Sequence, residues 1–263
     1  MAIRTKKFSR RSPLAAIVVV LAGLLVSGGS YVAATAAVSN TTKTEVDQAT
    51  IDTGKKLFLA NCASCHGKNA EGTKAAPSLI GVGGAAVEFQ VDSGRMPGQA
   101  SGPQLQVKKK QFTDEQIDAL VAYATTLGNG PDVPTEEMIA ANGDATRGGE
   151  LFRINCAMCH NAVGAGGALT QGKYAPALTK TSAEHIYEAM LTGPQNMPVF
   201  NDANLTPTDK KDIITYLTYV QTHQSAGGYE LGNLGPVVEG LFIWIFALGF
   251  IIAITIWLGA KSN

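Results

Sequence analysis

The chain carries one long apolar segment near each end and a region of mixed polar and apolar residues between them. Residues 240–258 (GLFIWIFALGFIIAITIWL) form a run of 19 residues without a charge. A helix rises about 1.5 Å per residue, so this run is long enough to span a bilayer core about 30 Å thick. Trp244 and Trp257 lie toward its two ends, where indole rings favour the membrane interface. This pattern predicts a transmembrane helix at about residues 237–258.

The N-terminal apolar segment has two interpretations. Residues 14–26 are apolar or small, a softer stretch continues to Val38, and five of the first eleven residues are basic. A basic flank, a short apolar run and an A-x-A sequence at 34–36 are typical of a cleavable signal peptide, whereas 14–38 is long enough for a retained signal-anchor helix. Both interpretations keep the basic flank in the cytoplasm and export the chain after Val38. We therefore expect a plasma-membrane protein with its central region on the extracytoplasmic face and Lys261 in the cytoplasm.

The region between the apolar segments contains two copies of one pattern. Four landmarks recur in the same order: a Gly-to-Asn segment, an Ala-Pro-x-Leu sequence, a Met-Pro sequence and an amphipathic segment. They lie at 54–61, 76–79, 96–97 and 113–123 in the first copy, and at 148–155, 175–178, 197–198 and 206–216 in the second. Such internal repetition indicates a duplicated structural unit. The predicted organisation is a basic and apolar segment at 1–38, domains at 39–129 and 143–225, a linker at 130–142, and a juxtamembrane and transmembrane segment at 226–263.

Each copy is predicted to begin and end with a helix. The apolar positions at 57–58 and 151–152 indicate a short amphipathic helix that runs into the following cysteine pair. Thr113 and Thr206 are good N-cap residues for the closing helices; Gln116 completes a capping box and Pro207 suits the first helical position. The Gly-rich stretches 81–89 and 161–179 are predicted to be irregular loops. Loops of that length need something to wrap around.

Composition narrows the possible functions. The chain has 21 basic and 21 acidic residues and a formal net charge of zero, so there is no basic footprint for nucleic acid. Only 7% of its residues are aromatic and 29 are glycine. Domains this poor in large side chains are expected to enclose something other than their own side chains.

Both copies contain the sequence Cys-x-x-Cys-His, at 62–66 (CASCH) and 156–160 (CAMCH). A c-type haem attaches when two cysteine thiols add to its vinyl groups, and the next residue, His, supplies an axial imidazole. The chain has four cysteines, and all of them lie in these motifs. The motifs therefore predict two covalent haem c groups, with attachment at Cys62, Cys65, Cys156 and Cys159 and with His66 and His160 on the irons.

Two other uses of paired cysteines fit the pattern less well. A thioredoxin-like dithiol does not explain a His directly after both pairs, and it belongs in a strand-rich βαβ context. A zinc site requires both pairs to converge on one metal, whereas here each pair belongs to its own repeat. In an exported protein, cysteine pairs without an attached haem would also tend to be oxidised to disulfides.

The ligand on the other face of each iron decides between electron transfer and ligand chemistry. Met96 and Met197 occupy equivalent Met-Pro sequences and are the predicted axial ligands. The second copy offers competitors, of which His185 is the main alternative to Met197. Of the others, Met158 is expected on the proximal side of the haem, Met190 in the core and His223 at a helix end.

Several other residues have weaker predicted roles. Pro77 and Pro176 recur between the cysteine motif and the methionine, and their carbonyls are candidates to accept a hydrogen bond from the second ring nitrogen of the ligating His. Glu239, at the mouth of the last apolar segment, is expected to be solvated. The lysines at 108–110 are expected to lie in a solvated loop, with a docking patch for an acidic partner as the alternative.

With these motifs assigned, each copy resembles a class I cytochrome c domain. The tandem pair with an apolar segment at each end is similar to the dihaem cytochrome c (cytochrome cc) subunit of the actinobacterial menaquinol:cytochrome c reductase, the cytochrome bc complex. The resemblance covers nearly the whole chain. It implies cytochrome b and Rieske iron-sulfur subunits as partners, and electron delivery to a haem-copper oxidase in a supercomplex.

The expected fold is therefore all-α: two tandem class I cytochrome c domains, an N-terminal signal or anchor segment and a C-terminal transmembrane helix. The expected function is electron transfer within a quinol:cytochrome c oxidoreductase (translocase), with no catalytic residue on this chain. Two alternatives remain at this point. One is a dihaem subunit of a terminal oxidase, and the other is a dihaem peroxidase, which requires one iron to be open.

Overall fold

The computed structural model describes residues 13–39, 47–99, 102–223 and 236–261, and it divides the chain into two units, Met1–Asp47 and Gln48–Asn263. In the first unit, α1 (Pro13–Ser39) is one helix that covers the whole N-terminal apolar segment. A helix is the form expected of both a signal peptide and a membrane anchor, so the two interpretations of this segment stand.

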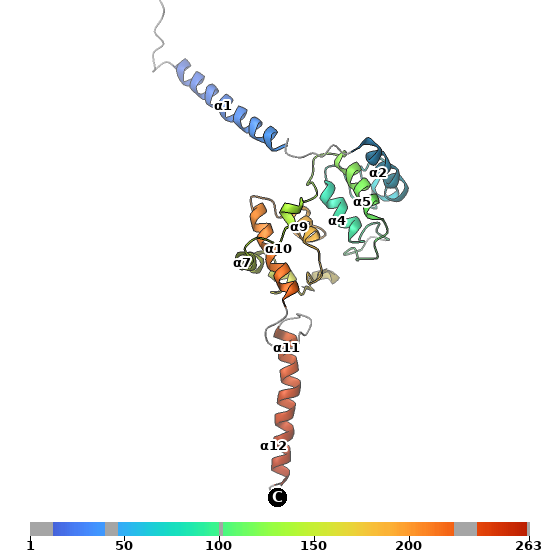
Figure 1. The fold of residues 1–263 in the computed structure, drawn as a ribbon, viewed down its shortest axis with the longest axis vertical. Coiled ribbons are helices and arrows are strands. Elements are labelled where there is room, and N and C mark those ends of the chain that lie inside the picture. Colours follow the sequence, from blue (N-terminus) through green and yellow to red (C-terminus); the bar gives the residue numbers. More distant parts are fainter. Residues whose placement is uncertain (1–12, 40–46, 100–101, 224–235, 262–263) are drawn as a thin grey trace, which may run out of the picture. The chain divides into compact units, whose positions relative to one another are not determined.

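The first repeat is built from four helices (Figure 1): α2 (Gln48–Asn61), α3 (Ala63–His66), α4 (Gly84–Asp92) and α5 (Asp114–Thr125). Helix α2 packs closely against α5. The crossing takes place at Gly54, where a Cβ atom would lie only 1.8 Å from the Ala119 carbonyl oxygen. The prediction that 81–89 is irregular was wrong, because α4 occupies most of it and packs against α5.

The second repeat has the same plan with additions. Helix α6 (Glu136–Ile139) lies in the predicted linker, and α7 (Ala145–Asn155) and α8 (Ala157–His160) correspond to α2 and α3. A two-stranded antiparallel pair, β1 (Gly167–Ala168) and β2 (Tyr174–Ala175), flanks the 3₁₀ turn η1 (Thr170–Gly172). Helices α9 (Ala183–Thr192) and α10 (Pro207–Thr222) complete the repeat. The stretch 161–179 was predicted to lack strands, so β1 and β2 are a correction.

The predicted helix starts are confirmed. Thr113 and Gln116 form a reciprocal capping box at the start of α5. Thr206 and Asp209 do the same for α10, with Pro207 in its first turn. These caps satisfy backbone N–H groups that a helix start otherwise leaves unpaired. They fix where each closing helix begins.

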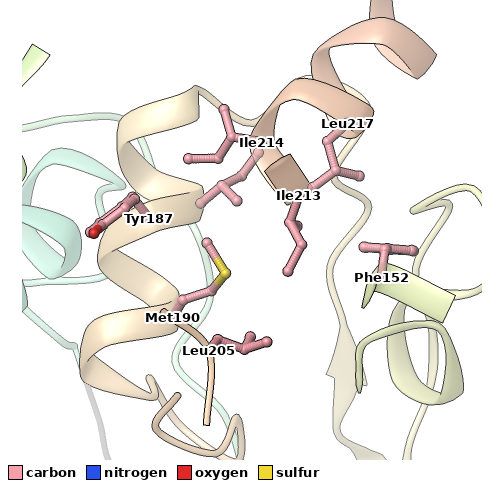
Figure 2. Packing of buried hydrophobic residues seen from close by; sticks show 8 residues of the cluster. Phe152, Tyr187, Met190, Leu205, Ile213, Ile214 and Leu217 are labelled. Carbon is pink, nitrogen blue, oxygen red and sulfur yellow. The ribbon is translucent and has the colours of Figure 1, made fainter. Parts of the chain in front are cut away.

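Each repeat has its own apolar core. In the second repeat, α9 contributes Tyr187 and Met190, and α10 contributes Ile213 and Leu217 (Figure 2). Phe152 of α7 belongs to the same cluster. The core of the first repeat is formed by Phe58, Ala70, Val91, Ile117, Leu120 and Tyr123. Helix α4 of the first repeat also packs against α9 of the second.

The C-terminal apolar segment is helical throughout its described part. Helix α11 (Pro236–Ile243), a π-helical turn η2 (Trp244–Leu248) and α12 (Gly249–Lys261) follow one another without a break. Within the described residues, Gly240–Ala260 is the one helical stretch long and apolar enough to cross a membrane. This agrees with the predicted membrane anchor.

Candidate haem-attachment sites

The two Cys-x-x-Cys-His motifs have the same backbone geometry. In the first, the N–H groups of Cys65 and His66 both donate to the Cys62 carbonyl, at 3.1 and 2.9 Å. In the second, the N–H groups of Cys159 and His160 donate to the Cys156 carbonyl at the same two distances. A single helical turn therefore carries both cysteines and the histidine, which is the arrangement required to join one porphyrin at two vinyl groups and one iron.

Each histidine is buried and held by a proline carbonyl. His66 Nδ1 donates to the Pro77 carbonyl at 2.8 Å, and His160 Nδ1 donates to the Pro176 carbonyl at 2.9 Å. A carbonyl can only accept, so this contact assigns the ring proton to Nδ1 and leaves Nε2 with a free lone pair for a metal. Burial lowers the pKa of His160, which the bond to Pro176 partly opposes. A neutral imidazole is the form that binds iron.

Three equivalent positions line the half-buried edge of each core. In the first repeat they are Cys62, Leu79 and Met96. In the second they are Cys156, Leu178 and Met197. An attachment cysteine and the predicted methionine ligand thus border the same apolar cluster in both repeats. Apolar walls with a thioether, two thiols and one imidazole are the donor set that a haem c requires, so the residues fit the group.

The backbone fixes both methionines just after a helix. The Met96 N–H donates to the Gln90 carbonyl at 2.8 Å, which ties the methionine to the end of α4. The Met197 N–H donates to the Pro194 carbonyl at 3.0 Å. Gly193 ends α9 in the left-handed conformation, with φ of 58°, and turns the chain toward Met197.

The competing ligands of the second repeat are engaged elsewhere. His185 Nε2 lies 2.9 Å from Asp92 Oδ2 of the first repeat. Met190 is buried in the core, and the side chain of Met158 is 94% exposed. His223 stacks on the ring of Tyr219 at the end of α10. His185 thus already has an acidic partner in this structure, whereas Met197 borders the core of its repeat.

No disulfide joins any of the four cysteines, so each is available for a thioether to haem. Burial, and then the neighbouring cysteine of each pair, raise the pKa of Cys62 and Cys156 to about 11. In the described residues, no group of three or more His, Cys, Asp or Glu side chains converges as a metal site would. The two cysteine pairs thus do not form a shared zinc site there. A haem attached to each cysteine pair would supply an iron that alternates between the ferrous and ferric states.

The lysines at 108–110 do not form a free basic patch. Lys110 pairs with Asp92 and Asp114, and Lys108 donates to the Pro97 carbonyl. The docking alternative is therefore weakened for these two residues. Glu239 lies in α11, and its side chain is outside the described part of the structure.

Sequence reasoning missed two features near the sites. Arg95, which precedes the predicted ligand Met96, is buried with its guanidinium carbon 4.9 Å from the centre of the Phe89 ring. Burial lowers the pKa of Arg95. Gln104 contacts Tyr174 of the other repeat. No sequence signal marks that contact, because it lies in a loop without a counterpart in the second copy.

Comparison with known proteins identifies a cytochrome c-type domain in each repeat. The family model described as "Cytochrome c" matches residues 51–128, and the one described as "Cytochrome C oxidase, cbb3-type, subunit III" matches residues 143–217. A protein named cytochrome bc1 complex cytochrome c subunit from Corynebacterium efficiens is 47% identical over 232 residues, covering 82% of this chain and 78% of that protein. The protein of the same name from Mycobacterium leprae is 46% identical over 249 residues, covering 92% and 86%.

A more distant relative matches less than half of the chain. The cbb3-type cytochrome c oxidase subunit FixP of Sinorhizobium medicae is 27% identical over 127 residues, covering 45% of this chain and 41% of that protein. The nearer relatives match most of the chain. The chain therefore belongs to the family of cytochrome c subunits of the cytochrome bc1 complex, electron-transfer proteins that carry two covalently bound haem c groups.

Proposed function

We propose that this chain receives electrons from a Rieske iron-sulfur protein and passes them through its two haem domains to a haem-copper terminal oxidase. The observation that carries the proposal is the matched geometry of the repeats. In both, a cysteine motif, a carbonyl-held histidine and a methionine border one apolar cluster. Two similar six-coordinate sites on one chain suit the transfer of single electrons and leave no open iron for substrate.

The axial pairs in this proposal are His66 with Met96 and His160 with Met197. A thioether opposite an imidazole stabilises the ferrous state and raises the reduction potential. The Pro77 and Pro176 carbonyls hold the two imidazoles in one tautomer and orientation. Similar pairs on both domains support exchange of electrons between them with little change in free energy.

The proposed topology places both haem domains on the extracytoplasmic face. The basic residues before α1 and Lys261 after the last apolar helix favour the cytoplasm for both ends. A chain anchored in this way works as a fixed conductor beside cytochrome b and the Rieske protein. It replaces a diffusing carrier, and it supports the translocase activity of the complex without doing chemistry itself.

The partners can be tested by purification through an affinity tag on this chain in mild detergent. We expect cytochrome b, the Rieske protein and a haem-copper oxidase to co-purify. Haem staining of the denatured chain tests the attachment sites. Cys62→Ala with Cys65→Ala should remove about half of the covalent haem, and the Cys156 and Cys159 double variant should remove the other half. Unchanged haem content in either variant would refute the assignment.

One alternative has an observation in its favour. The second repeat matches a family of cbb3-type oxidase subunits, and FixP is a relative of part of the chain. The alternative function is therefore a dihaem subunit belonging to a terminal oxidase. Recovery of an oxidase that lacks cytochrome b and the Rieske protein in the same purification would establish it instead.

A further inference from the structure

A short segment after Met96, residues 102–108, joins the first repeat to the second. The Gln104 side chain makes two hydrogen bonds to the backbone of Tyr174: its amide nitrogen donates to the Tyr174 carbonyl, and its amide oxygen accepts from the Tyr174 N–H, both at 2.8 Å. The side-chain amide thus pairs with β2 in the way that a neighbouring strand does. Both polar groups of Gln104 and both of the Tyr174 backbone are satisfied by this one contact.

Two further hydrogen bonds extend the contact. The Tyr174 hydroxyl donates to Gln106 Oε1 at 3.2 Å. The Leu105 N–H donates to Gln195 Oε1 at 3.3 Å. Four hydrogen bonds therefore run between this segment and two separate loops of the second repeat. We call Gln104, Leu105, Gln106, Tyr174 and Gln195 the interdomain clamp.

On the second repeat, the clamp attaches beside both predicted iron-ligand loops. Tyr174 lies two residues before Pro176, whose carbonyl holds His160. Gln195 lies two residues before Met197. Lys173 Nζ donates to Asn196 Oδ1 at 3.0 Å and connects the two loops. The clamp therefore contacts both the His side and the Met side of this site, while the Lys173–Asn196 bond joins the two loops without it.

On the first repeat, the clamp starts from the methionine loop. A Cβ atom at Gly98 would lie 3.3 Å from Leu105 Cδ2 and 3.8 Å from Met96 Sδ, so both side chains flank that glycine. Lys108 donates to the Pro97 carbonyl and closes the loop. The segment that reaches the second repeat is thus packed against the predicted ligand of the first.

A second contact between the repeats, of α4 with α9, combines favourable pairs with crowded carboxyls: His185 lies 2.9 Å from Asp92 and packs edge-on against Phe89. Helices α4 and α9 bring Glu88 and the fully buried Glu188 together, with Glu184 and Asp92 nearby. Burial, and then the neighbouring carboxyls, raise the pKa of Glu188 to about 9 and that of Glu88 to about 7, so this contact requires carboxyl groups to stay protonated as the pH rises. Asp92 is offset by His185 and Lys110, but neither glutamate faces a cation that would offset it in the same way. The neutral, paired hydrogen bonds of the clamp carry no such cost.

We infer that Gln104 is a positioning residue for electron transfer between the two haem domains, because it holds the methionine loop of the first against the ligand loops of the second. The inference rests on the proposed function in that both domains carry electrons. Removal of this side chain should leave each haem site intact and let the domains separate. Electron transfer between them should then slow, because it depends steeply on their separation.

The test uses the full haem-loaded chain in mild detergent. Since all four native cysteines form thioethers, cysteines introduced at the exposed positions Lys56 of α2 and Glu150 of α7 can be labelled selectively with nitroxides. Pulsed electron-electron double resonance then reports the distance between domains. For Gln104→Ala we expect the ratio of separated to clamped molecules to rise roughly tenfold or more, since two hydrogen bonds are lost. The interdomain electron-transfer rate after flash reduction should fall, with both midpoint potentials unchanged.

Two further variants test whether the effect depends on the paired hydrogen bonds of Gln104. Gln104→Glu places a carboxylate oxygen against the Tyr174 carbonyl oxygen, which repels it, so this variant should separate the domains at least as much as Gln104→Ala. Gln99→Ala removes an exposed glutamine of the same loop and should change neither distance nor rate. A narrow, unchanged distance distribution in Gln104→Ala, or an equal effect of Gln99→Ala, would overturn the inference. Failure of cytochrome b to co-purify would refute the proposed function and leave these distances unaffected.

Discussion

The close crossing of α7 and α10 gives a quantitative test of the repeat architecture. Gly148 lies where these helices meet, and a Cβ atom there would lie 1.9 Å from the Asp212 carbonyl oxygen. The obstacle is backbone in a helix, so it cannot rotate away as a side chain can. Gly148→Ala therefore requires the two helices to move apart.

The expected cost follows from that separation. An ordinary contact for a Cβ atom begins at 3.4 Å, so the helices must separate by about 1.5 Å. Overpacking typically costs ~1–3 kcal/mol, and here the fully buried Phe152 and Ile213 must shift with their helices, which points to the upper end or beyond. Alanine recovers up to ~1 kcal/mol of helix propensity relative to glycine. We expect a net loss of about 2–3 kcal/mol, or a melting temperature lower by ~10–20 °C for a domain of this size.

Thermal unfolding of the haem-loaded chain, followed by circular dichroism, measures this effect. Gly149→Ala is the matched control: it lies in the same helix and gains the same propensity, but the atoms nearest its Cβ would belong to side chains, the Tyr216 ring at 3.1 Å and Arg153 Nη1 at 3.4 Å. A ring can tilt, so this variant should stay within about 1 kcal/mol of the unmodified chain. Equal stability of the two variants would show that the crossing is looser than described. Gly54→Ala should repeat the large loss in the first domain.

Two further substitutions test a buried carboxyl and an iron ligand. Burial, and then the charge of Glu88, raise the pKa of Glu188 above its ordinary value of 4.5. From about pH 4.5 upward, the folded chain therefore binds more protons than the unfolded chain. Its free energy of unfolding falls as the pH rises. Denaturant titrations between about pH 5 and pH 9 should show a shallower fall in Glu188→Gln, and an equally steep fall would contradict the burial argument. Met197→Ala should let about half of the haem in the reduced chain bind carbon monoxide, whereas His185→Ala should bind none. Carbon monoxide binding to the His185 variant would make that histidine the ligand.

Features set by local chemistry could be predicted from the sequence. The spacing of Cys62, Cys65 and His66 is dictated by the porphyrin, so the motif specifies its own helical turn. Thr113 and Thr206 specify helix starts because their hydroxyls satisfy nearby backbone N–H groups. The last apolar segment is long and uniform enough to be recognised without any knowledge of its neighbours.

Features set by distant contacts could not be predicted. The glycines before α4 suggested a loop, yet Gly83 is there because a Cβ atom would lie 2.3 Å from the Pro131 carbonyl oxygen. The Ala85 N–H donates to that same carbonyl, so the segment 130–131 supports the start of the helix. Local propensity cannot show this support, because the partner lies more than forty residues away in the sequence.

The internal repeat predicted what the two domains share and gave no information about what distinguishes them. Shared positions build each predicted haem site: the cysteines, the histidine, the proline carbonyl and the methionine. The contact between the domains is built from unshared parts, namely the segment around Gln104 in the first copy and β2 with Tyr174 in the second. Here the two copies meet through surfaces that are not equivalent, so the residues on each side of the contact have no counterpart in the other copy. Residues that break the repeat are therefore where a function of the pair, as opposed to a function of one haem, should be sought.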